Sequence, residues 1–438
     1  MNGRGLILAA PSSGSGKTLL TLALLRAFRR LGLRVGAAKA GPDFIDPGFH
    51  AAALGAPSVN LDPWAMREST LTGLAGALEE ANEIVLCEGA MGLFDGAGPE
   101  GEAGSTAALS RLLGWPIVLL VDARGMGASA AALVRGFASH DPALPLLGVV
   151  FNRVRSARHG RLLAQAMARH LPQLALFGAL PEKPDFAIPS RHLGLVPAGE
   201  IAGIEALIER AAQRVALCLD IDRLLSAARS SGFSAARGAA LPAFGGRIAV
   251  ARDAAFSFLY SSQLEGWKAE GASLSFFSPL AGEAPEREAE AIVLPGGYPE
   301  LYAGRIAGSH AFLSALRRAA GLGKPIYGEC GGYMVLGESL VDQEGRSHPM
   351  AGLLPLVSSF QKRQRALGYR SARLLRAGPC GEAGSLFRGH EFHYASILAQ
   401  EGEPLFAAAD AEGRSLGLSG LRREGVSGSF IHLIDRGD

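Results

Sequence analysis

Two α/β domains are predicted from three features of the sequence. Its 438 residues exceed what one core ordinarily holds, since domains usually run to about 100–200 residues. Short apolar runs alternate with longer helical patterns, which predicts parallel strands joined by crossover helices. Residues 230–246 are rich in Gly, Ala and Ser, a composition typical of linkers. We therefore expect domains at 1–235 and 247–438, joined by a linker at 236–246.

The first domain opens with a strand and a helix. Residues 5–10 form an apolar run that predicts a buried strand, and 18–31 carry apolar residues at helical spacing. Gly32 is a plausible helix stop. Further strands are predicted at the apolar runs that lie at 83–87, 116–121 and 146–151. The second domain begins with a strand at 247–251, and helical and strand signals are expected to alternate to the C-terminus.

Composition excludes several classes of protein. Hydrophobic residues make up 48% and charged residues 19%, as in globular proteins, and the formal net charge of +2 indicates no nucleic-acid-binding stripe. The four cysteines are widely spaced without a CxxC pattern, which argues against disulfides or zinc and favours a reducing cytoplasm. No apolar stretch reaches the roughly 20 residues that span a bilayer. We expect a cytoplasmic protein that binds neither nucleic acid nor membrane.

A glycine-rich loop follows the first strand. Residues 11–18 read PSSGSGKT and lead into the predicted helix. Glycines let backbone N–H groups close around phosphate oxygens, and a helix N-terminus favours negative charge. Lys17 can reach the β- and γ-phosphates, and Thr18 can ligate magnesium. Pro11 stands where the usual pattern has its first glycine. A Gly/Ser-rich turn with a chance lysine is the alternative, which the strand–loop–helix context disfavours.

Charged residues follow other predicted strands. Lys39 lies at the end of one candidate strand, and Asp46 follows that strand in the sequence. Glu88 follows the apolar run at 83–87. Ligands of open α/β sheets bind at the carboxyl ends of the strands, and phosphoryl transfer needs magnesium ligands and positive charge. Asp46 and Glu88 are the magnesium candidates and Lys39 the phosphate candidate. Each could singly be an ordinary loop residue, but beside the phosphate loop we favour a functional role.

A cysteine nucleophile is predicted in the second domain. Cys330 lies in GECGGY between a predicted strand and helix, the form of a nucleophile elbow. The helix N-terminus is expected to lower the thiol pKa, and His432 is the candidate base. The amides of Gly297 and Gly331 are candidates for an oxyanion hole. The alternatives are a buried structural cysteine and a core histidine.

The segment GHEFHY at 389–394 is not an HExxH motif. On a strand, His390 and Phe392 would share one face, and Glu391 and His393 the other. We interpret it as a substrate-contacting or structural strand rather than a zinc site.

Taken together, these motifs resemble the a,c-diamide synthases of corrinoid biosynthesis, which act on cobyrinic or hydrogenobyrinic acid. The segments that carry the resemblance span the chain in order: PSSGSGKT (11–18), AGPDFIDPGFH (40–50), CEGAMGLFDG (87–96), FNRV (151–154), PSRHLGLVPAGE (189–200), PGGYPELY (295–302), YGECGGYMVLG (327–337), LGYR (367–370), GHEFHYA (389–395) and FIH (430–432).

The resemblance implies a P-loop, dethiobiotin-synthetase-like ATP domain fused to a flavodoxin-like class I glutamine amidotransferase domain. It further implies that ATP and Mg²⁺ activate carboxylates as acyl phosphates, and that glutamine supplies ammonia at Cys330, with His432 as activator. The implied ATP-binding residues are Ser13, Gly14, Ser15, Gly16, Lys17, Thr18, Lys39 and Asn152. The implied residues that position the substrate carboxylate are Asp43, Asp46 and Asp95, and the metal ligands are Thr18, Asp46 and Glu88.

Two departures from the family pattern stand out. Phe44 replaces a frequent tyrosine. Two residues after the histidine, where class I amidotransferases carry glutamate, the chain has Ile434, with Asp435 next. We therefore expect a Cys–His dyad with its third member unassigned.

Other readings are kept as alternatives. Within the wider family, cobyric acid synthases amidate other corrinoid carboxylates, and a relative acts on a nickel sirohydrochlorin. Outside it, the chain could be a P-loop partitioning ATPase with an inactive second domain, or a metal-dependent hydrolase built on His390 and His393. A homodimer is kept as an open hypothesis for the assembly.

Overall fold

The computed structural model describes residues 3–98, 100–182, 190–191, 194–195, 201–236, 238–362 and 364–437. Most of the segment 189–200, which contributes to the resemblance, and linker position 237 lie outside these ranges. Contacts divide the chain into two compact units: Met1–Trp64 with Glu68–Ala236, and Ala65–Arg67 with Arg237–Asp438. Each unit contains a sheet of mainly parallel strands covered by helices, which confirms the predicted α/β class.

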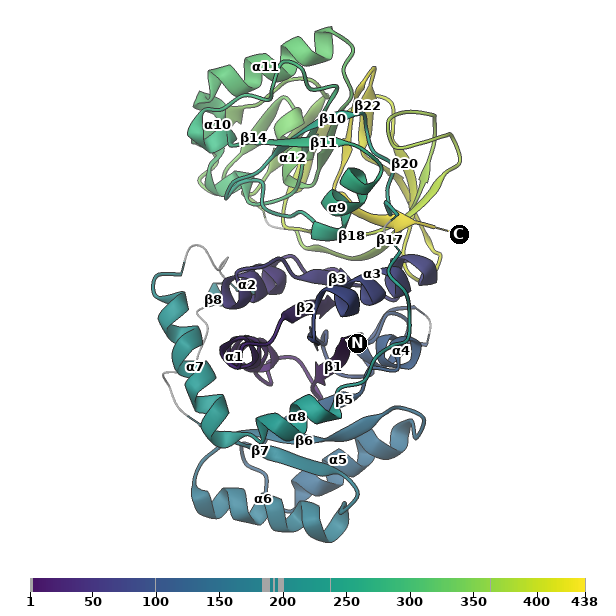
Figure 1. The fold of residues 1–438 in the computed structure, drawn as a ribbon. Helices are drawn as coiled ribbons and strands as arrows, with labels where there is room; N and C mark the ends of the chain where they lie inside the picture. The colour runs from purple at the N-terminus through teal and green to yellow at the C-terminus, as the bar shows by residue number, and fades with distance from the viewer. Residues whose placement is uncertain are drawn as a thin grey trace. The chain divides into compact units, whose positions relative to one another are not determined.

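The first unit is built on one parallel sheet (Figure 1). In the described ranges its strands run in the order β3 (Val59–Leu61), β2 (Val35–Ala40), β4 (Ile84–Glu88), β1 (Arg4–Ala9), β5 (Ile117–Asp122), β6 (Leu146–Val154) and β7 (Ala175–Pro181). All neighbouring pairs are parallel. The strands predicted from apolar runs are therefore present, with ends that differ by a few residues.

Right-handed crossovers decide which face of the sheet each helix covers. The helices of one face are α1 (Lys17–Arg30), α2 (Ile45–Leu54) and α7 (Ile204–Cys218), which pack on one another. The opposite face carries α3 (Glu68–Ala81), α4 (Thr106–Leu113), α5 (Ser129–His140) and α6 (Ala157–His170). The buried leucines of α1 and the apolar residues of β1 share one core, and α8 (Ile221–Ala227) closes its edge.

The second unit contains a sheet of similar design. Its order is β11 (Ser273–Phe277), β10 (Arg247–Ala251), β12 (Ala291–Leu294), β13 (Ile326–Glu329), β23 (Val426–Ser429) and β22 (Leu421–Arg423). All pairs are parallel except β22 with β23. The accompanying helices are α9 (Ser261–Ala269), α10 (Ala303–Gly308), α11 (His310–Gly321) and α12 (Gly331–Leu336).

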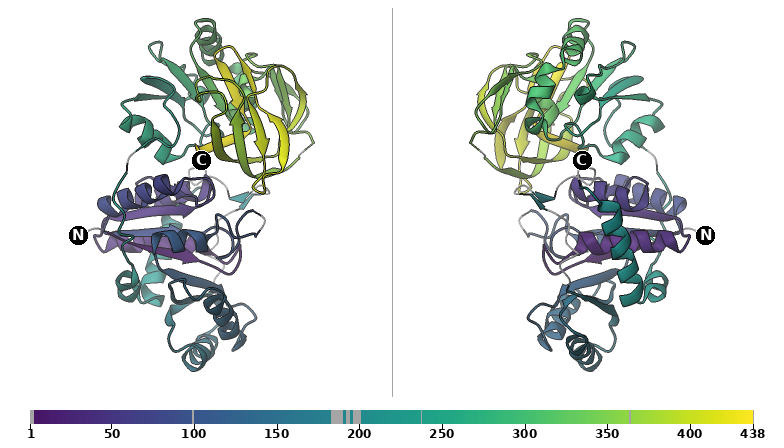
Figure 2. Two further views of the ribbon diagram at one scale, coloured as in Figure 1. Left: turned by 90° about the vertical axis from the view of Figure 1, so that its right-hand side faces the viewer. Right: turned by 90° about the vertical axis from the view of Figure 1, so that its left-hand side faces the viewer.

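The expected alternation of helices and strands to the C-terminus is wrong. After α12 the described chain forms strands without a further helix. One sheet joins β14 (Ser339–Val341), β15 (Ser347–Pro349), β16 (Leu356–Ser359) and β19 (Ser396–Gln400). The other joins β17 (Ala366–Leu374), β18 (Leu386–His393), β20 (Phe406–Ala409), β21 (Ser415–Ser419) and β24 (Ile431–Arg436). Figure 2 shows these strands in yellow-green, curling beside the parallel sheet of their unit.

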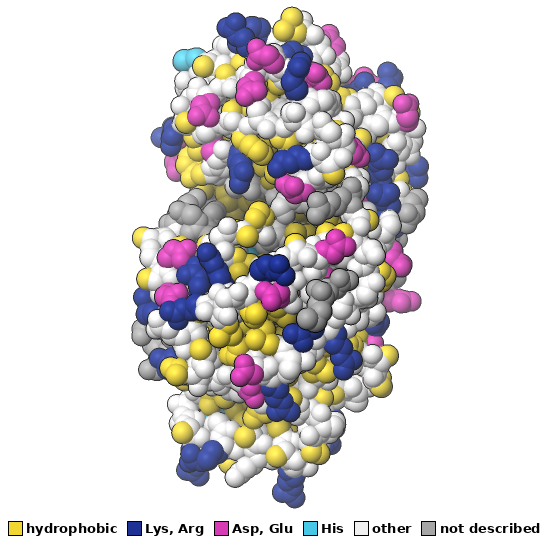
Figure 3. All heavy atoms as spheres, in the orientation of Figure 1, with side chains coloured by type: hydrophobic (Ala, Val, Ile, Leu, Met, Phe, Trp, Pro, Cys, Tyr) yellow, Lys and Arg dark blue, Asp and Glu magenta, His cyan; other side chains and the backbone are white. Residues whose placement is uncertain are grey.

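The surface carries no segregated charge on the face shown in Figure 3, where basic and acidic side chains are interspersed. Among the helices of the described chain, none has the length and apolar character to cross a membrane.

The Glu79 side chain on helix α3 holds the segment that follows α8. Its carboxylate is buried and accepts hydrogen bonds from the Trp115 indole N–H over 2.6 Å, the Ser231 amide over 2.7 Å and the Ser230 hydroxyl over 2.8 Å. The bond to the indole satisfies a buried N–H, and leaving such a group without a partner costs about 1–3 kcal/mol.

We expect Glu79→Ala to destabilise the first unit by about 2–4 kcal/mol, because it strands the Trp115 and Ser231 donors. Thermal unfolding of the full chain measures this. Glu68→Ala, at the exposed start of the same helix, is the matched control and should change stability by less than about 1 kcal/mol. Equal midpoints for the two variants would contradict this account.

Candidate active sites

The loop between β1 and α1 depends on two glycines. Gly14 and Gly16 have φ of 76° and 98°, in the left-handed region that glycine adopts without strain. A Cβ on Gly16 would lie 2.5 Å from Asn152 Nδ2, and this amide donates to the carbonyl oxygen of Ser15 over 2.9 Å. Asn152, predicted as an ATP-binding residue, therefore holds the loop from β6.

Arg153 supports the same loop and was not singled out from the sequence. Its guanidinium donates to the Gly14 carbonyl oxygen over 2.9 Å and to Asp122 Oδ2 over 2.5 Å. Ser13 is exposed at the loop tip, while Ser15 is buried and donates its hydroxyl to the loop backbone. The loop is thus fastened from β5 and β6 with its tip open to solvent.

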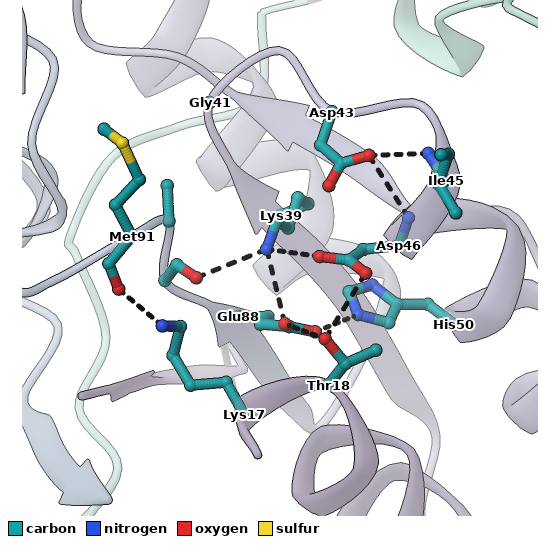
Figure 4. Close-up of polar contacts among 12 residues, drawn as sticks. Lys17, Thr18, Lys39, Gly41, Asp43, Ile45, Asp46, His50, Glu88 and Met91 are labelled. Atoms are coloured by element: carbon teal, nitrogen blue, oxygen red, sulfur yellow. Dashed lines mark hydrogen bonds and ion pairs between the residues drawn. The ribbon is translucent and has the colours of Figure 1, made fainter. Parts of the chain in front are cut away.

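A buried charged cluster lies beside the loop (Figure 4). Lys39 Nζ lies 2.6 Å from Asp46 Oδ2 and 3.3 Å from Glu88 Oε1. The Thr18 hydroxyl donates to Glu88 Oε1 over 2.8 Å and lies 3.3 Å from Asp46 Oδ1. Parallel pairing sets Lys39 on β2 opposite Glu88 on β4, and α1 and α2 supply the other two residues. The structure therefore brings together the three predicted metal ligands and the predicted phosphate-binding lysine.

The charged groups of this cluster shift one another's pKa values. Burial alone would lower the pKa of Lys39, but the attraction of Glu88 and Asp46 outweighs it, and the pKa is raised. Burial likewise opposes ionisation of Glu88, yet Lys39 and a hydrogen bond from His50 bring its pKa below the usual range. Burial and the neighbouring Glu88 raise the pKa of Asp46. Two carboxylates share one lysine, so an added cation would relieve the repulsion from Glu88 that helps to raise the pKa of Asp46.

His50 is a member of the cluster that the sequence analysis did not assign. Its Nε2 lies 2.8 Å from Glu88 Oε2 and its Nδ1 lies 3.0 Å from the Ser58 hydroxyl, and all three side chains are buried. A signal was available in the sequence, because His50 follows Asp46 by four residues and so lies on the same helical face. The histidine fixes the orientation of the Glu88 carboxylate.

Lys17 turns toward the loop after β4. Its ammonium donates to the carbonyl oxygens of Met91 and, over 3.4 Å, of Ser12. Burial, with the nearby charge of Lys39, lowers the pKa of Lys17 to about 8. Asp95 accepts the Gly92 amide over 2.9 Å, which closes the same loop into a turn.

Asp43 begins helix α2. Its Oδ1 accepts the amide of Ile45 over 2.6 Å and lies 3.4 Å from the amide nitrogen of Asp46. Its carbonyl oxygen accepts the Asn60 side-chain amide over 2.7 Å. The carboxylate therefore shapes the loop that presents Asp46.

The donor set of the cluster fits a hard divalent cation. A hydroxyl and two carboxylates are the oxygen ligands that Mg²⁺ accepts, and magnesium usually binds through one or two carboxylates together with substrate phosphates. Among the described residues no three His, Cys, Asp or Glu side chains gather in a geometry that could hold a metal ion.

Cys330 occupies a strained turn in the second unit. Between β13 and α12 it has φ 46° and ψ −102°, a conformation that non-glycine residues rarely adopt. A Cβ on Gly332 would lie 1.9 Å from the Leu294 carbonyl oxygen, so helix α12 packs directly on β12. The predicted strand, sharp turn and helix are present around Cys330, and tight packing holds the turn in its strained conformation.

His432 lies beside Cys330. A Cβ added to Gly296 would be 2.3 Å from His432 Cε1, 3.2 Å from its Nε2 and 3.3 Å from Cys330 Cβ, so both side chains converge on this glycine. An added Cβ on Gly331 would lie 3.1 Å from the Gly297 amide nitrogen. The candidate base and the two candidate oxyanion donors therefore gather around one thiol.

The predicted lowering of the thiol pKa is wrong. Burial raises the pKa of Cys330, and the charges of Glu300, Glu391 and Glu329 raise it further. Helix α12 has only six residues, and its N-terminus cannot offset full desolvation. The thiol is therefore protonated at neutral pH and needs a base to form the thiolate.

The GHEFHY strand lies against the cysteine. The Phe392 carbonyl oxygen is 3.9 Å from Cys330 Sγ. Glu391 accepts Arg370 Nε over 2.6 Å and lies 3.0 Å from His393 Nε2, so the predicted pairing of Glu391 and His393 on one face is confirmed. The sequence analysis gave Arg370 no role, because only the pairing of β17 with β18 brings it near Glu391; in that register Arg370 lies opposite Gly389.

His390 points to the other face of that strand. It lies opposite His432 in the register of β18 and β24, and its ring meets the Tyr369 ring edge-on with centroids 5.8 Å apart. Burial, helped by the charges of His432 and Arg370, lowers the pKa of His390 to about 3. The residue is therefore neutral at physiological pH.

Comparisons with known proteins cover both units. Residues 6–196 match the family model of the CobQ/CobB/MinD/ParA nucleotide binding domain, and residues 247–438 match the CobB/CobQ-like glutamine amidotransferase domain. The hydrogenobyrinate a,c-diamide synthase of Rhodobacter capsulatus is 52% identical over 98% of both chains. Proteins of the same name from Rhizobium meliloti and Brucella abortus are each 49% identical, covering 98% and 99% of this chain.

We expect acid to destabilise the chain partly through His390. Its folded-state pKa lies below the ordinary 6.5, so between pH 6.5 and about 3 the unfolded chain binds more protons and stability falls as pH falls. At pH 5 the loss is about 2 kcal/mol relative to pH 7.5. Thermal unfolding against pH should give a shallower slope for His390→Gln than for the unchanged chain. His310→Gln, which alters an exposed histidine, should keep the original slope; identical slopes for all three proteins would refute this role.

Proposed function

The chain belongs to the hydrogenobyrinate a,c-diamide synthase family, and we propose that it amidates the a and c acetate carboxylates of a corrinoid acid in cobalamin biosynthesis. ATP is the activating cosubstrate and glutamine the nitrogen donor. The observation that carries the proposal is 52% identity to a named synthase across 98% of both chains, which includes both candidate sites. The relatives' names favour hydrogenobyrinic acid, without cobalt, over cobyrinic acid.

In the first unit, the loop at 11–18 would bind the phosphates of ATP. Backbone N–H groups between Ser13 and Thr18 surround the phosphates, and the Lys17 ammonium leaves its backbone acceptors to bind the transferred phosphoryl group. The buried ammonium of Lys39 remains charged and stabilises the negative charge that develops on that group. The substrate carboxylate attacks the γ-phosphorus, ADP leaves, and an acyl phosphate forms.

Magnesium fits the oxygen ligands of Thr18, Asp46 and Glu88, which would hold it in contact with the phosphates. When bound, it neutralises phosphate charge and orients the phosphoryl group. His50 keeps Glu88 in position for this role. Asp43 and Asp95 shape the two loops that would receive the substrate carboxylate.

In the second unit, Cys330 would hydrolyse glutamine. His432 takes the thiol proton, and the sulfur attacks the side-chain amide carbon while the amides of Gly297 and Gly331 stabilise the oxyanion. The proton passes to the leaving nitrogen, ammonia departs, and water hydrolyses the thioester to glutamate. Ammonia then displaces phosphate from the acyl phosphate to give the amide.

We also propose that the enzyme works in the cytoplasm, which its free cysteines support, and that it forms a homodimer. Light scattering of the purified protein tests the dimer.

The full chain, with Mg-ATP, glutamine and hydrogenobyrinic acid, should convert two carboxylates to amides, counted by mass spectrometry. Cys330→Ser should lose at least about 100-fold of the glutamine-dependent rate but keep amidation from ammonium salts, because only the nitrogen donor is affected. Cys380→Ser, which alters a buried thiol outside both sites, is the matched control. No amidation of hydrogenobyrinic or cobyrinic acid by the unchanged chain would refute the substrate, and a third or fourth amide would indicate the cobyric acid synthase alternative.

Glu88→Gln should impair amidation from both nitrogen donors and spare glutamine hydrolysis. We expect at least about 100-fold slower amidation from glutamine and from ammonium alike, since the loss of a ligand charge weakens magnesium binding in both cases. Calorimetric titration with Mg-ATP should show weaker binding, and glutamine hydrolysis without the corrinoid should continue. Glu83→Gln, on the exposed surface beside the same strand, is the control. Normal amidation by Glu88→Gln would rule out the proposed magnesium site.

A further inference from the structure

The glutamate that class I amidotransferases carry two residues after the histidine is absent from this chain. Two residues after His432 stands Ile434, which is apolar and buried. Asp435, the next residue, accepts the Arg67 amide over 2.9 Å and its guanidinium over 2.8 and 3.1 Å. In the register of β24 with β18, Asp435 pairs with Arg388, and Arg67 engages both of its carboxylate oxygens.

Glu329 instead lies beside the imidazole. Its Oε2 is 3.7 Å from His432 Nδ1, and its Oε1 accepts the Leu433 amide over 3.1 Å. Both side chains are buried, with exposures of 8% for Glu329 and 1% for His432. The hydrogen bond to the residue after His432 fixes the carboxylate against the strand that carries the histidine.

The strained elbow explains how two consecutive residues reach one ring. Successive side chains of a straight strand point to opposite faces. The positive φ of Cys330 breaks that alternation at the end of β13. Cys330 Cβ and His432 Nε2 converge on Gly296, while the Glu329 carboxylate lies at Nδ1. The carboxylate therefore faces one nitrogen of the imidazole, while the other nitrogen and Cys330 Cβ both lie beside Gly296.

We propose that Glu329 is the third member of the glutaminase site: a positioning residue that orients His432 and stabilises its imidazolium. The inference rests on the proposed glutaminase function. His432 Nε2 accepts the Cys330 proton, and the carboxylate at Nδ1 compensates the positive charge until the proton passes to the departing ammonia. The 3.7 Å separation shortens to a hydrogen bond as charge develops, because catalytic contacts are often long in unliganded sites.

The charge of Glu329 can favour reaction of the Cys330 thiol in only one way. The negative charge of Glu329 opposes thiolate formation at Cys330, as does burial, which is the larger effect. Glu329 can therefore assist the thiol only through His432, by favouring the imidazolium that forms with the thiolate.

Glu329→Gln is the decisive variant, because the amide keeps an acceptor for the Leu433 N–H and removes only the charge. In the full chain we expect kcat for glutamine hydrolysis to fall roughly 10- to 100-fold with a change in glutamine KM of less than about threefold. Ammonium-driven amidation should stay within about twofold. Glu329→Asp, which keeps the charge, should recover part of the loss. Glu338→Gln, on the exposed surface, is the control.

Alkylation of Cys330 gives a second readout that is independent of turnover. Peptide mass spectrometry follows modification of this cysteine by iodoacetamide, which should slow in Glu329→Gln. In a His432→Ala background, Glu329→Gln should not slow the alkylation of Cys330 further, because Glu329 acts through the imidazole.

Each outcome decides a separate point. Glutaminase within twofold of normal in Glu329→Gln overturns the proposal and leaves the amidoligase intact. Loss of glutaminase in Asp435→Asn, with ammonium-driven amidation retained, would assign the role to Asp435 instead. If adding Glu329→Gln to His432→Ala slowed the alkylation of Cys330 further, Glu329 would act without His432, which also overturns the proposal. An unchanged chain without any glutaminase activity would refute the proposed function itself.

Discussion

Parallel pairing of strands is the constraint on which both candidate sites depend. Strands that run the same way end at the same edge, so the side chains and loops that follow them converge. In the first unit this pairing sets Lys39 opposite Glu88, although the two residues are far apart in the chain. In the second unit it sets Glu329 opposite Ser429, three residues before His432. Each site is therefore assembled from segments that only the sheet brings together.

The two sites differ in how they accommodate buried ionisable groups. Around Lys39, two carboxylates and one ammonium are kept within contact distance, and the repulsion between the two carboxylates suits the site to an added cation. Around Cys330, burial suppresses ionisation of the thiol. A charged site is ready to receive a charged cosubstrate, whereas a neutral thiol becomes reactive only when a base takes its proton. This difference fits phosphoryl transfer in one unit and nucleophilic attack on a neutral amide in the other.

Backbone geometry has as large a part as side chains. Gly16 permits the close approach of Asn152, Gly332 permits helix α12 to lie on β12, and Gly296 leaves room for the thiol and the imidazole together. A methyl group at any of these positions would meet another atom at 2.5 Å or less. The strain at Cys330 persists because this packing holds it in place. These glycines are therefore functional positions even though they contribute no reactive group.

The α/β class, the strand–loop–helix at 11–18, the sharp turn at Cys330, and the candidate residues at 39, 46, 88, 330 and 432 could be predicted from the sequence alone. This is possible because each belongs to a local pattern, a glycine-rich turn or a run of apolar residues, whose physics acts over a few neighbours. Only the tertiary structure decided what depends on distant contacts: the all-strand C-terminal part, the partnership of His50 with Glu88 and of Arg370 with Glu391, and the carboxylate that faces His432. It also reversed the expected pKa shift of Cys330, because the extent of burial is a property of the packed fold and not of the motif.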